Sequence, residues 1–265
     1  MKHTTQVVIV AAWLGSRMWD YTKDKPKCML WLQDGVTIIQ RNISTLIKCG
    51  IAVENIVVVW GYCYDILAQY LQSLFPWIQC VCNSRYAETN MVYSLSCAFD
   101  YLDPHRNTLL VYGDILYEED IIQGIVKHTW IYIAADTDWH DMWMYKYGTI
   151  QDDIEEFIVS AGIVTHIGGQ TNDPLQQQVR YIGIIWISAD FIQHYIQEIQ
   201  DMFLKTPSSI NMHMTDFLQY LIDRSHTLHV YATSSRWWEF DTQRDYELFR
   251  EDYNTYEWTL FPRFS

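Results

Sequence analysis

The sequence predicts an α/β protein with a Rossmann-like, doubly wound, mixed but mostly parallel sheet. Apolar runs of strand length alternate with segments of helical spacing through residues 1–135. The strand-like runs are apolar throughout, which is typical of strands that are buried on both faces by helices. Hydrophobic residues make up 49% of the 265-residue chain, enough for one large domain over residues 1–265.

The first half of the chain predicts strands and helices in alternation. Residues 7–12 form an apolar run that ends in a polar turn, so we expect a buried first strand and not a signal peptide. A helix is expected over residues 37–48, because isoleucine and leucine recur at helical spacing and Gly50 is a helix stop. Further strands are expected at 55–60, 77–82 and 108–112, and further helices at 64–74, 90–102 and 121–127.

Residues 136–180 interrupt this alternation with polar and aromatic sequence, glycine-containing strings and an Asn-Asp-Pro turn. We expect them to form an inserted β-rich subdomain or lid. A strand is expected again at residues 181–188. Helices at 191–203 and 215–222, a strand at 228–231 and a last helix at 242–253 complete the prediction.

Composition limits the classes of partner. The formal charge of −14 argues against a nucleic-acid backbone or an anionic membrane, because both would be repelled. The six cysteines form no CxxC pair, so we expect reduced thiols and a cytoplasmic protein. His213, His226 and His229 have no cysteine or carboxylate at metal-ligand spacing. The sequence carries no signal for an oligomeric state.

A loop with a glycine, a serine and an arginine follows the first predicted strand. Backbone N–H groups of such a loop can surround a triphosphate, and Arg17 and Lys27 supply positive charge. Two solvated cations on a surface loop are the alternative. The candidate nucleotide-binding residues of this loop are Ala11, Ala12, Trp13, Leu14, Gly15 and Ser16.

Two carboxylates follow predicted strands at distant places in the chain. Asp114 comes after Gly113, a further candidate nucleotide-binding residue, at the end of one strand, and Asp241 lies at a strand-to-helix junction near the C-terminus. Ligands of α/β proteins bind at the carboxyl ends of parallel strands, and two carboxylates there can hold a Mg²⁺ that bridges phosphate oxygens. Taken singly, Asp114 could cap a turn or helix and Asp241 could be a helix N-cap.

Residues 83–95 join a predicted strand to a predicted helix and carry three polar candidates for binding a nucleoside. The amides of Asn83 and Asn90 and the hydroxyl of Ser94 can hydrogen-bond to a base and a ribose. An asparagine-rich turn that caps a helix is the alternative for each of them.

Twelve tryptophans are several times the usual number. Aromatic faces beside a carboxylate make a site for an ammonium group, although each tryptophan taken alone is more typical of a core. Together they favour a cationic or zwitterionic ligand over a neutral sugar. The candidates are Trp139, Trp143, Trp186, Trp238 and Glu239.

These motifs resemble those of nucleotide-diphosphate-sugar pyrophosphorylases and related cytidylyltransferases. Residues 11–17 and 26–27 are similar to the family loop A-A-G-x-G-S/T-R followed by P-K. The pattern N-x-x-Y-x-x-x-N-x-x-Y-S-L of residues 83–95 is similar to that of bacterial phosphocholine cytidylyltransferases. The features follow one another in the order of the family along nearly the whole chain. They are the glycine-containing loop, residues 83–95, the aspartate at the end of a strand, the insertion and the E-x-D of residues 239–241.

The resemblance implies a GT-A-like fold and a Mg²⁺-dependent nucleotidyltransferase. It implies that Asp114 and Asp241 bind the metal, that Lys27 and Arg17 are catalytic, and that residues 136–180 bind the acceptor. The substrates implied are a nucleoside triphosphate, with CTP favoured, and a small phosphorylated amine, amino acid or phosphonate, with release of pyrophosphate.

One departure from the family pattern leaves alternatives open. Trp13 stands where the family has a glycine, which lets the backbone approach the nucleotide closely. A catalytically silent nucleotide-binding relative is therefore one alternative, and a sugar-1-phosphate nucleotidyltransferase is another. A third is a heavily altered family sequence, in which the fold survives better than the function.

Overall fold

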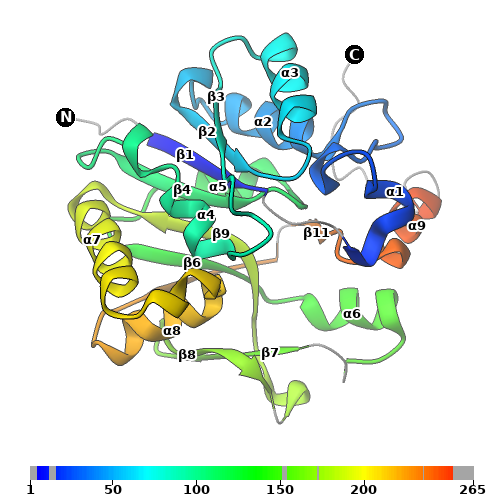
Figure 1. Cartoon of the computed structure of the whole chain (residues 1–265). Helices are drawn as coiled ribbons and strands as arrows, with labels where there is room; N and C mark the ends of the chain where they lie inside the picture. The colour runs from blue at the N-terminus through cyan, green and yellow to red at the C-terminus, as the bar shows by residue number, and fades with distance from the viewer. Residues whose placement is uncertain (1–4, 12–15, 151–153, 172, 235, 253–265) are drawn as a thin grey trace.

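A computed structural model describes residues 5–11, 16–150, 154–171, 173–234 and 236–252 of the chain. Its centre is a nine-stranded sheet in the order β3-β2-β1-β4-β9-β6-β10-β8-β7 (Figure 1). The strands are β1 Thr5–Val10, β2 Ile56–Trp60, β3 Gln79–Cys82, β4 Asn107–Tyr112, β6 Ile131–Asp136, β7 Glu155–Ser160, β8 Ile163–Gln170, β9 Arg180–Ile187 and β10 His229–Thr233.

The sheet is mixed and mostly parallel, as the sequence predicts. The strands β3, β2, β1 and β4 pair in parallel, and β6 pairs in parallel with β10. The strand β9 runs antiparallel between β4 and β6. Because β9 reverses direction, its first residues lie at the same edge of the sheet as the last residues of β4.

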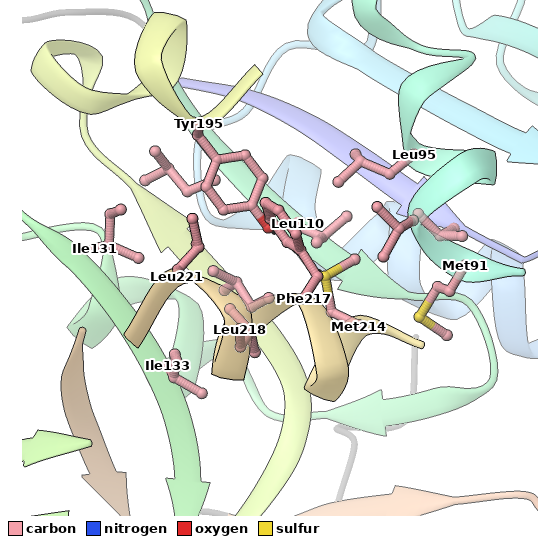
Figure 2. Close-up of a cluster of buried hydrophobic side chains, with 14 of the residues drawn as sticks. Met91, Leu95, Leu110, Ile131, Ile133, Tyr195, Met214, Phe217, Leu218 and Leu221 are labelled. Carbon is pink, nitrogen blue, oxygen red and sulfur yellow. Dashed lines mark hydrogen bonds between the residues drawn. The ribbon is translucent and has the colours of Figure 1, made fainter. Parts of the chain in front are cut away.

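Helices cover both faces of the sheet (Figure 1). One core contains residues of α4 (Met91–Ser96), α7 (Ala189–Lys205) and α8 (Met214–Asp223), and the other contains residues of α2 (Ile38–Lys48), α3 (Tyr64–Leu74) and α5 (Glu119–Ile125). The apolar run of β1 supplies both cores, because Val8 and Val10 face one layer while Val7 and Ile9 face the other. Figure 2 shows Phe217 and Leu221 of α8 packed beside Leu110 of β4 and Ile133 of β6.

Most predicted elements are confirmed within a few residues, but five helices and strands were missed. These are β6, α6 (Trp139–Tyr147), the four-residue helix α1 (Trp19–Thr22) and a small antiparallel sheet of β5 (Ile115–Tyr117) and β11 (Trp237–Glu239). The predicted helix 90–102 is shorter, ending at Ser96 and continuing as a 3₁₀ turn at Phe99–Tyr101. The short helix α1 and the last helix, α9 (Gln243–Asp252), complete the fold.

The segment 136–180 consists of α6 and the β7–β8 hairpin. Its strand β8 pairs with β10, so the hairpin extends the main sheet. Phe157, Val164 and Ile167 of the hairpin pack into the same core as α8. The two strands of the hairpin therefore form one edge of the central sheet, and the expectation that residues 136–180 are an inserted subdomain or lid stays a prediction.

No helix among the described residues is both long enough and apolar enough to cross a membrane.

We expect Gly183→Ala to destabilise the protein more than Gly162→Ala. Both glycines have left-handed backbone, with φ of 79° and 77°, where an L-residue costs about 1–2 kcal/mol. A Cβ at Gly183 would lie 2.7 Å from Cδ2 of Tyr112, whereas a Cβ at Gly162 would have no atom within 4 Å. Urea unfolding of both variants measures the difference, and equal losses of unfolding free energy would contradict the proposed close approach of β9 to Tyr112.

Candidate active site

A cavity of about 580 Å³ opens where β4 ends and β9 begins. Its walls come from the turn before α4, the start of α8, and the residues on either side of Phe240. Arg17, Lys27, Asp114, Glu239 and Asp241 line it together. Five of the candidate residues from distant parts of the sequence therefore lie in one cavity.

A buried lysine lies between the two candidate metal-binding aspartates. The Nζ atom of Lys27 lies 2.5 Å from Oδ2 of Asp114 and 3.3 Å from Oδ1 of Asp241. Nη2 of Arg17 lies 3.6 Å from the same oxygen of Asp241. The Lys27 side chain is only 7% exposed and that of Arg17 is 57% exposed, so Lys27 forms the floor of the cavity and Arg17 its mouth.

The local fold explains why these groups meet. Pro26 holds extended backbone (φ −62°, ψ 149°) before the 3₁₀ turn Lys27–Met29, whose three side chains are buried. The small sheet pairs Glu239 with Ile115, and the backbone N–H of Phe240 donates to the carbonyl of Asp114 at 3.1 Å. This pairing sets Asp241 beside Asp114.

The alternative that Asp241 caps the last helix is not what the structure shows. Asp245 accepts hydrogen bonds from the backbone N–H groups of Asp241 and Thr242, at 3.0 and 2.7 Å. The side chain of Asp241 points instead to Lys27. Asp245 is fully buried and pairs with Lys146 at 3.1 Å, and Lys146 also donates to the carbonyl of Glu239 at 2.7 Å.

The charges in the cavity follow from burial and mutual contact. Burial would lower the pKa of Lys27, but Asp114 and Asp241 outweigh it and raise the pKa, so Lys27 stays protonated. Burial would raise the pKa of Asp241, but Lys27 and Arg17 lower it overall. Burial and the charge of Asp241 raise the pKa of Glu239 to about 8.

The donor set is suited to Mg²⁺. Oδ1 of Asp114 is buried and has no hydrogen-bond partner among the residues that the structure describes, so one oxygen remains for a ligand. The carboxylate of Asp241 faces the same lysine. Mg²⁺ binds through one or two carboxylates together with substrate phosphates, and Asp114 and Asp241 provide such a pair.

Residues 83–95, which carry the three candidates for binding a nucleoside, contain one candidate that supports the turn and two that line the cavity. Asn83 is fully buried and donates to Thr89 Oγ1 at 3.1 Å and to Ser94 Oγ at 2.9 Å, so it holds the turn and does not line the cavity. Asn90 and Ser94 do line it. Asn90 also caps α4, because its Oδ1 accepts from the N–H of Met91 at 2.8 Å.

Four residues of the candidate nucleotide-binding loop lie outside the described residues, namely Ala12, Trp13, Leu14 and Gly15. Ser16 begins a 3₁₀ turn that ends at Met18. Ala11 and Gly113 lie beside each other, and a Cβ on Gly113 would come within 2.6 Å of the Cβ of Ala11. Neither residue is part of the cavity lining, so their part in the site is to allow this close approach.

The four candidate tryptophans do not line the cavity, which corrects the expectation that their faces bind a ligand. All four are nearly fully buried, because an indole contributes a large apolar surface to a core. Nε1 of Trp139 donates to the carbonyl of Gln177 at 3.2 Å, and Nε1 of Trp186 donates to that of His128 at 2.9 Å. Trp143 packs on Trp139, and Trp238 packs on Phe249.

Two charged residues and one histidine that line the cavity were missed as site residues from the sequence: Glu155, Arg180 and His213. Burial raises the pKa of Glu155, although Oε1 of Glu155 accepts from Thr215 at 3.1 Å. The only sequence signal for Arg180 is a cation at the start of an apolar strand, which does not reveal the direction of its side chain.

The histidines also need a correction. His226 lies 3.4 Å and His194 lies 3.6 Å from Oε1 of Glu198, although the sequence shows no such partners for His226. Arg224 approaches Oε2 of Glu198 at 3.0 Å and supplies its counter-charge. Contacts between α7 and the end of α8 bring these residues together, and none of them lines the cavity.

Comparison with known proteins gives a consistent family. Residues 7–163 match the model of the MobA-like NTP transferase domain. The chain is 30% identical over 250 residues to the CTP:phosphoglutamine cytidylyltransferase of Campylobacter jejuni, covering 91% of this chain and 97% of that protein. It is 33% identical over 119 residues to the 2-aminoethylphosphonate cytidylyltransferase of Lancefieldella rimae, covering 45% of this chain and 47% of that protein.

A solved structure shares the fold. The CTP:phosphocholine cytidylyltransferase of Streptococcus pneumoniae superposes with a TM-score of 0.73 at 18% identity, covering 95% of this chain and all of that one.

We expect the free energy of unfolding to fall less in the Glu239→Gln variant than in the wild type when the pH rises from 5.5 to 8.5. The folded chain holds a proton on Glu239 up to about pH 8, whereas the ordinary pKa is 4.5. Folded protein therefore binds more protons in this window, and the free energy of unfolding falls as the pH rises through it. Thermal unfolding with EDTA at both pH values measures the loss.

Glu54→Gln is the matched control, because Glu54 is an exposed glutamate outside the cavity. It should lose as much stability as the wild type over the same window. An equal loss in Glu239→Gln would show that Glu239 is ionised normally in the folded chain.

Proposed function

The chain belongs to the MobA-like NTP transferase family and is a nucleotidyltransferase, and we propose that it transfers a cytidylyl group from CTP to a small phosphorylated amine, amino acid or phosphonate. The observation that carries this proposal is the meeting of Asp114 and Asp241 at Lys27 in one cavity. The named activities of the relatives support CTP and an acceptor that carries an amine and a phosphate or phosphonate.

The reaction needs positioning and charge compensation more than a nucleophilic side chain. An oxygen of the acceptor phosphate attacks the α-phosphorus of CTP, the bond from that phosphorus to the bridging oxygen breaks, and pyrophosphate leaves. Lys27 is held protonated between two carboxylates and can stabilise negative charge at the reacting phosphates. Arg17 lies at the mouth of the cavity, where its exposed side chain can reach the leaving phosphates.

Asp114 and Asp241 are the residues that would hold Mg²⁺. When bound, Mg²⁺ supplies charge neutralisation for phosphate oxygens. The unpartnered Oδ1 of Asp114 supports this assignment, because a buried carboxylate oxygen without a partner is costly unless a ligand completes it.

Asn90 and Ser94 are proposed to contact the nucleoside, and Glu239 and Glu155 the amine of the acceptor. The lining of one cavity by all four supports this division. We also propose a cytoplasmic location with reduced thiols, supported by six cysteines that are all free.

A panel of triphosphates and acceptors tests the proposed reaction. Pyrophosphate release with Mg²⁺ should be fastest with CTP and a phosphorylated amine or amino acid. Turnover only with hexose 1-phosphates would identify a sugar nucleotidyltransferase. Nucleotide binding without turnover for any pair would identify a catalytically silent relative.

We expect Asp114→Asn to lower Mg²⁺-dependent turnover by at least about a hundredfold, because it removes a charged metal ligand and a partner of Lys27. Pyrophosphate release measures the loss, and far-ultraviolet circular dichroism should show an unchanged fold. Asp173→Asn, an exposed aspartate outside the cavity, is the control and should keep full activity. Retained activity in Asp114→Asn would refute the metal role.

A further inference from the structure

Arg180 is a cation of the cavity that the proposed mechanism does not use. It is the first residue of β9 and lines the cavity. Its guanidinium Cζ lies 3.7 Å from the centroid of the Trp143 ring, so the guanidinium packs against the indole. The Trp143 ring in turn makes an edge-to-face contact with the Trp139 ring, and the two ring centroids are 6.3 Å apart. The guanidinium is therefore placed on a rigid aromatic support.

Two of its nitrogens lack hydrogen-bond partners. Nε and Nη1 of Arg180 are buried, and no acceptor among the described residues bonds to them. A buried donor without a partner is destabilising, and the cost is larger for a charged group. Native structures rarely keep such groups unless a ligand or water completes them.

Three carboxyl groups are neighbours of Arg180 in the sheet or in the cavity lining, namely Asp136, Glu155 and Glu239, and none of them bonds to those nitrogens. Asp136 pairs with Arg180 across β6 and β9, and the charge of Arg180 lowers the pKa of all three carboxylates against the larger effect of burial. Both oxygens of Asp136 are already used, by Nε1 of Trp237 at 2.8 Å and by the N–H of Asp138 at 2.9 Å.

The three cations that line the cavity fall into two groups by their contacts. Lys27 and Arg17 contact Asp241 and form the region proposed for the reacting phosphates. Arg180 packs on Trp143 and lines the same cavity as Glu155 and Glu239, which are proposed to take the amine of the acceptor. A phosphorylated amine has one anionic group, which the first region would take, and would leave Arg180 without a partner.

We propose that Arg180 binds a carboxylate of the acceptor, so that the acceptor is a phosphorylated amino acid and not a phosphorylated amine. This inference rests on the proposed function and specifies the substrate class of the same site. Guanidinium groups bind carboxylates with charged hydrogen bonds. Glu155 and Glu239 line the same cavity and are the candidates to take the ammonium of that amino acid.

The test compares acceptors that differ only in the carboxylate. O-phospho-L-serine and phosphoethanolamine form one such pair. Glutamine phosphorylated on its side-chain amide and the same compound without its α-carboxylate form a second. The wild type should prefer the carboxylate-bearing member by about 10- to 100-fold in kcat/KM, as expected for a charged hydrogen bond.

In Arg180→Met this preference should fall to near one, because only the carboxylate-bearing acceptor loses its contact. Arg180→Lys should keep part of the preference, and it also serves as the test variant if Arg180→Met does not fold. Arg224→Met removes an arginine outside the cavity and should keep the full preference. A preference unchanged in both Arg180 variants would overturn the proposal, as would equal losses on both acceptors, which indicate contact with the phosphate.

Failure of the proposed function gives a different result. Absence of turnover with all four acceptors would contradict the cytidylyl transfer. Calorimetric titration of the same acceptors into protein with a non-hydrolysable CTP analogue would then decide the role of Arg180. Tighter binding of the carboxylate-bearing member to the wild type but not to Arg180→Met supports the proposal, and equal binding in both proteins overturns it.

Discussion

The contact of Lys27 with Asp114 and Asp241 is the interaction on which the site depends. Three buried or half-buried charges come from segments that are far apart in sequence. Each would be costly alone, and two carboxylates this close would repel without the cation. Two features of the surrounding structure hold this contact in place. The 3₁₀ turn that follows Pro26 positions Lys27, and the pairing of β5 with β11 places the two aspartates side by side.

The sequence predicts the parts of the fold that have a strong local signal. Strands β1, β2, β4 and β9 each contain a continuous apolar run and were all anticipated, and Asp114 and Asp241 were singled out as candidates because each follows a strand. The sheet of β5 and β11 was missed because three-residue strands have no periodicity to read. Arg180 was missed because a sequence does not show whether a cation at a strand end faces solvent or a cavity.

The tryptophans show how composition can mislead about a site. Their number suggested a cage for an ammonium group, but the indoles act one layer behind the cavity. Trp143 supports the guanidinium of Arg180, Trp237 donates to Asp136, and Trp238 lies 4.4 Å from Nζ of Lys146. A rigid apolar shell holds charged side chains in fixed positions, which is the preorganisation that electrostatic catalysis requires.

The end of β11 and the two residues after it connect the two parts of the cavity. Glu239 and Asp241 are two residues apart and both line the cavity, while Phe240 between them is buried in a separate core. The N–H of Phe240 is bonded to the carbonyl of Asp114, so this short segment cannot shift without moving the aspartate pair. One backbone segment thus fixes the position of the region proposed for the acceptor relative to the region proposed for the reacting phosphates. A change in the backbone of residues 239–241 should therefore affect acceptor binding and phosphate chemistry together.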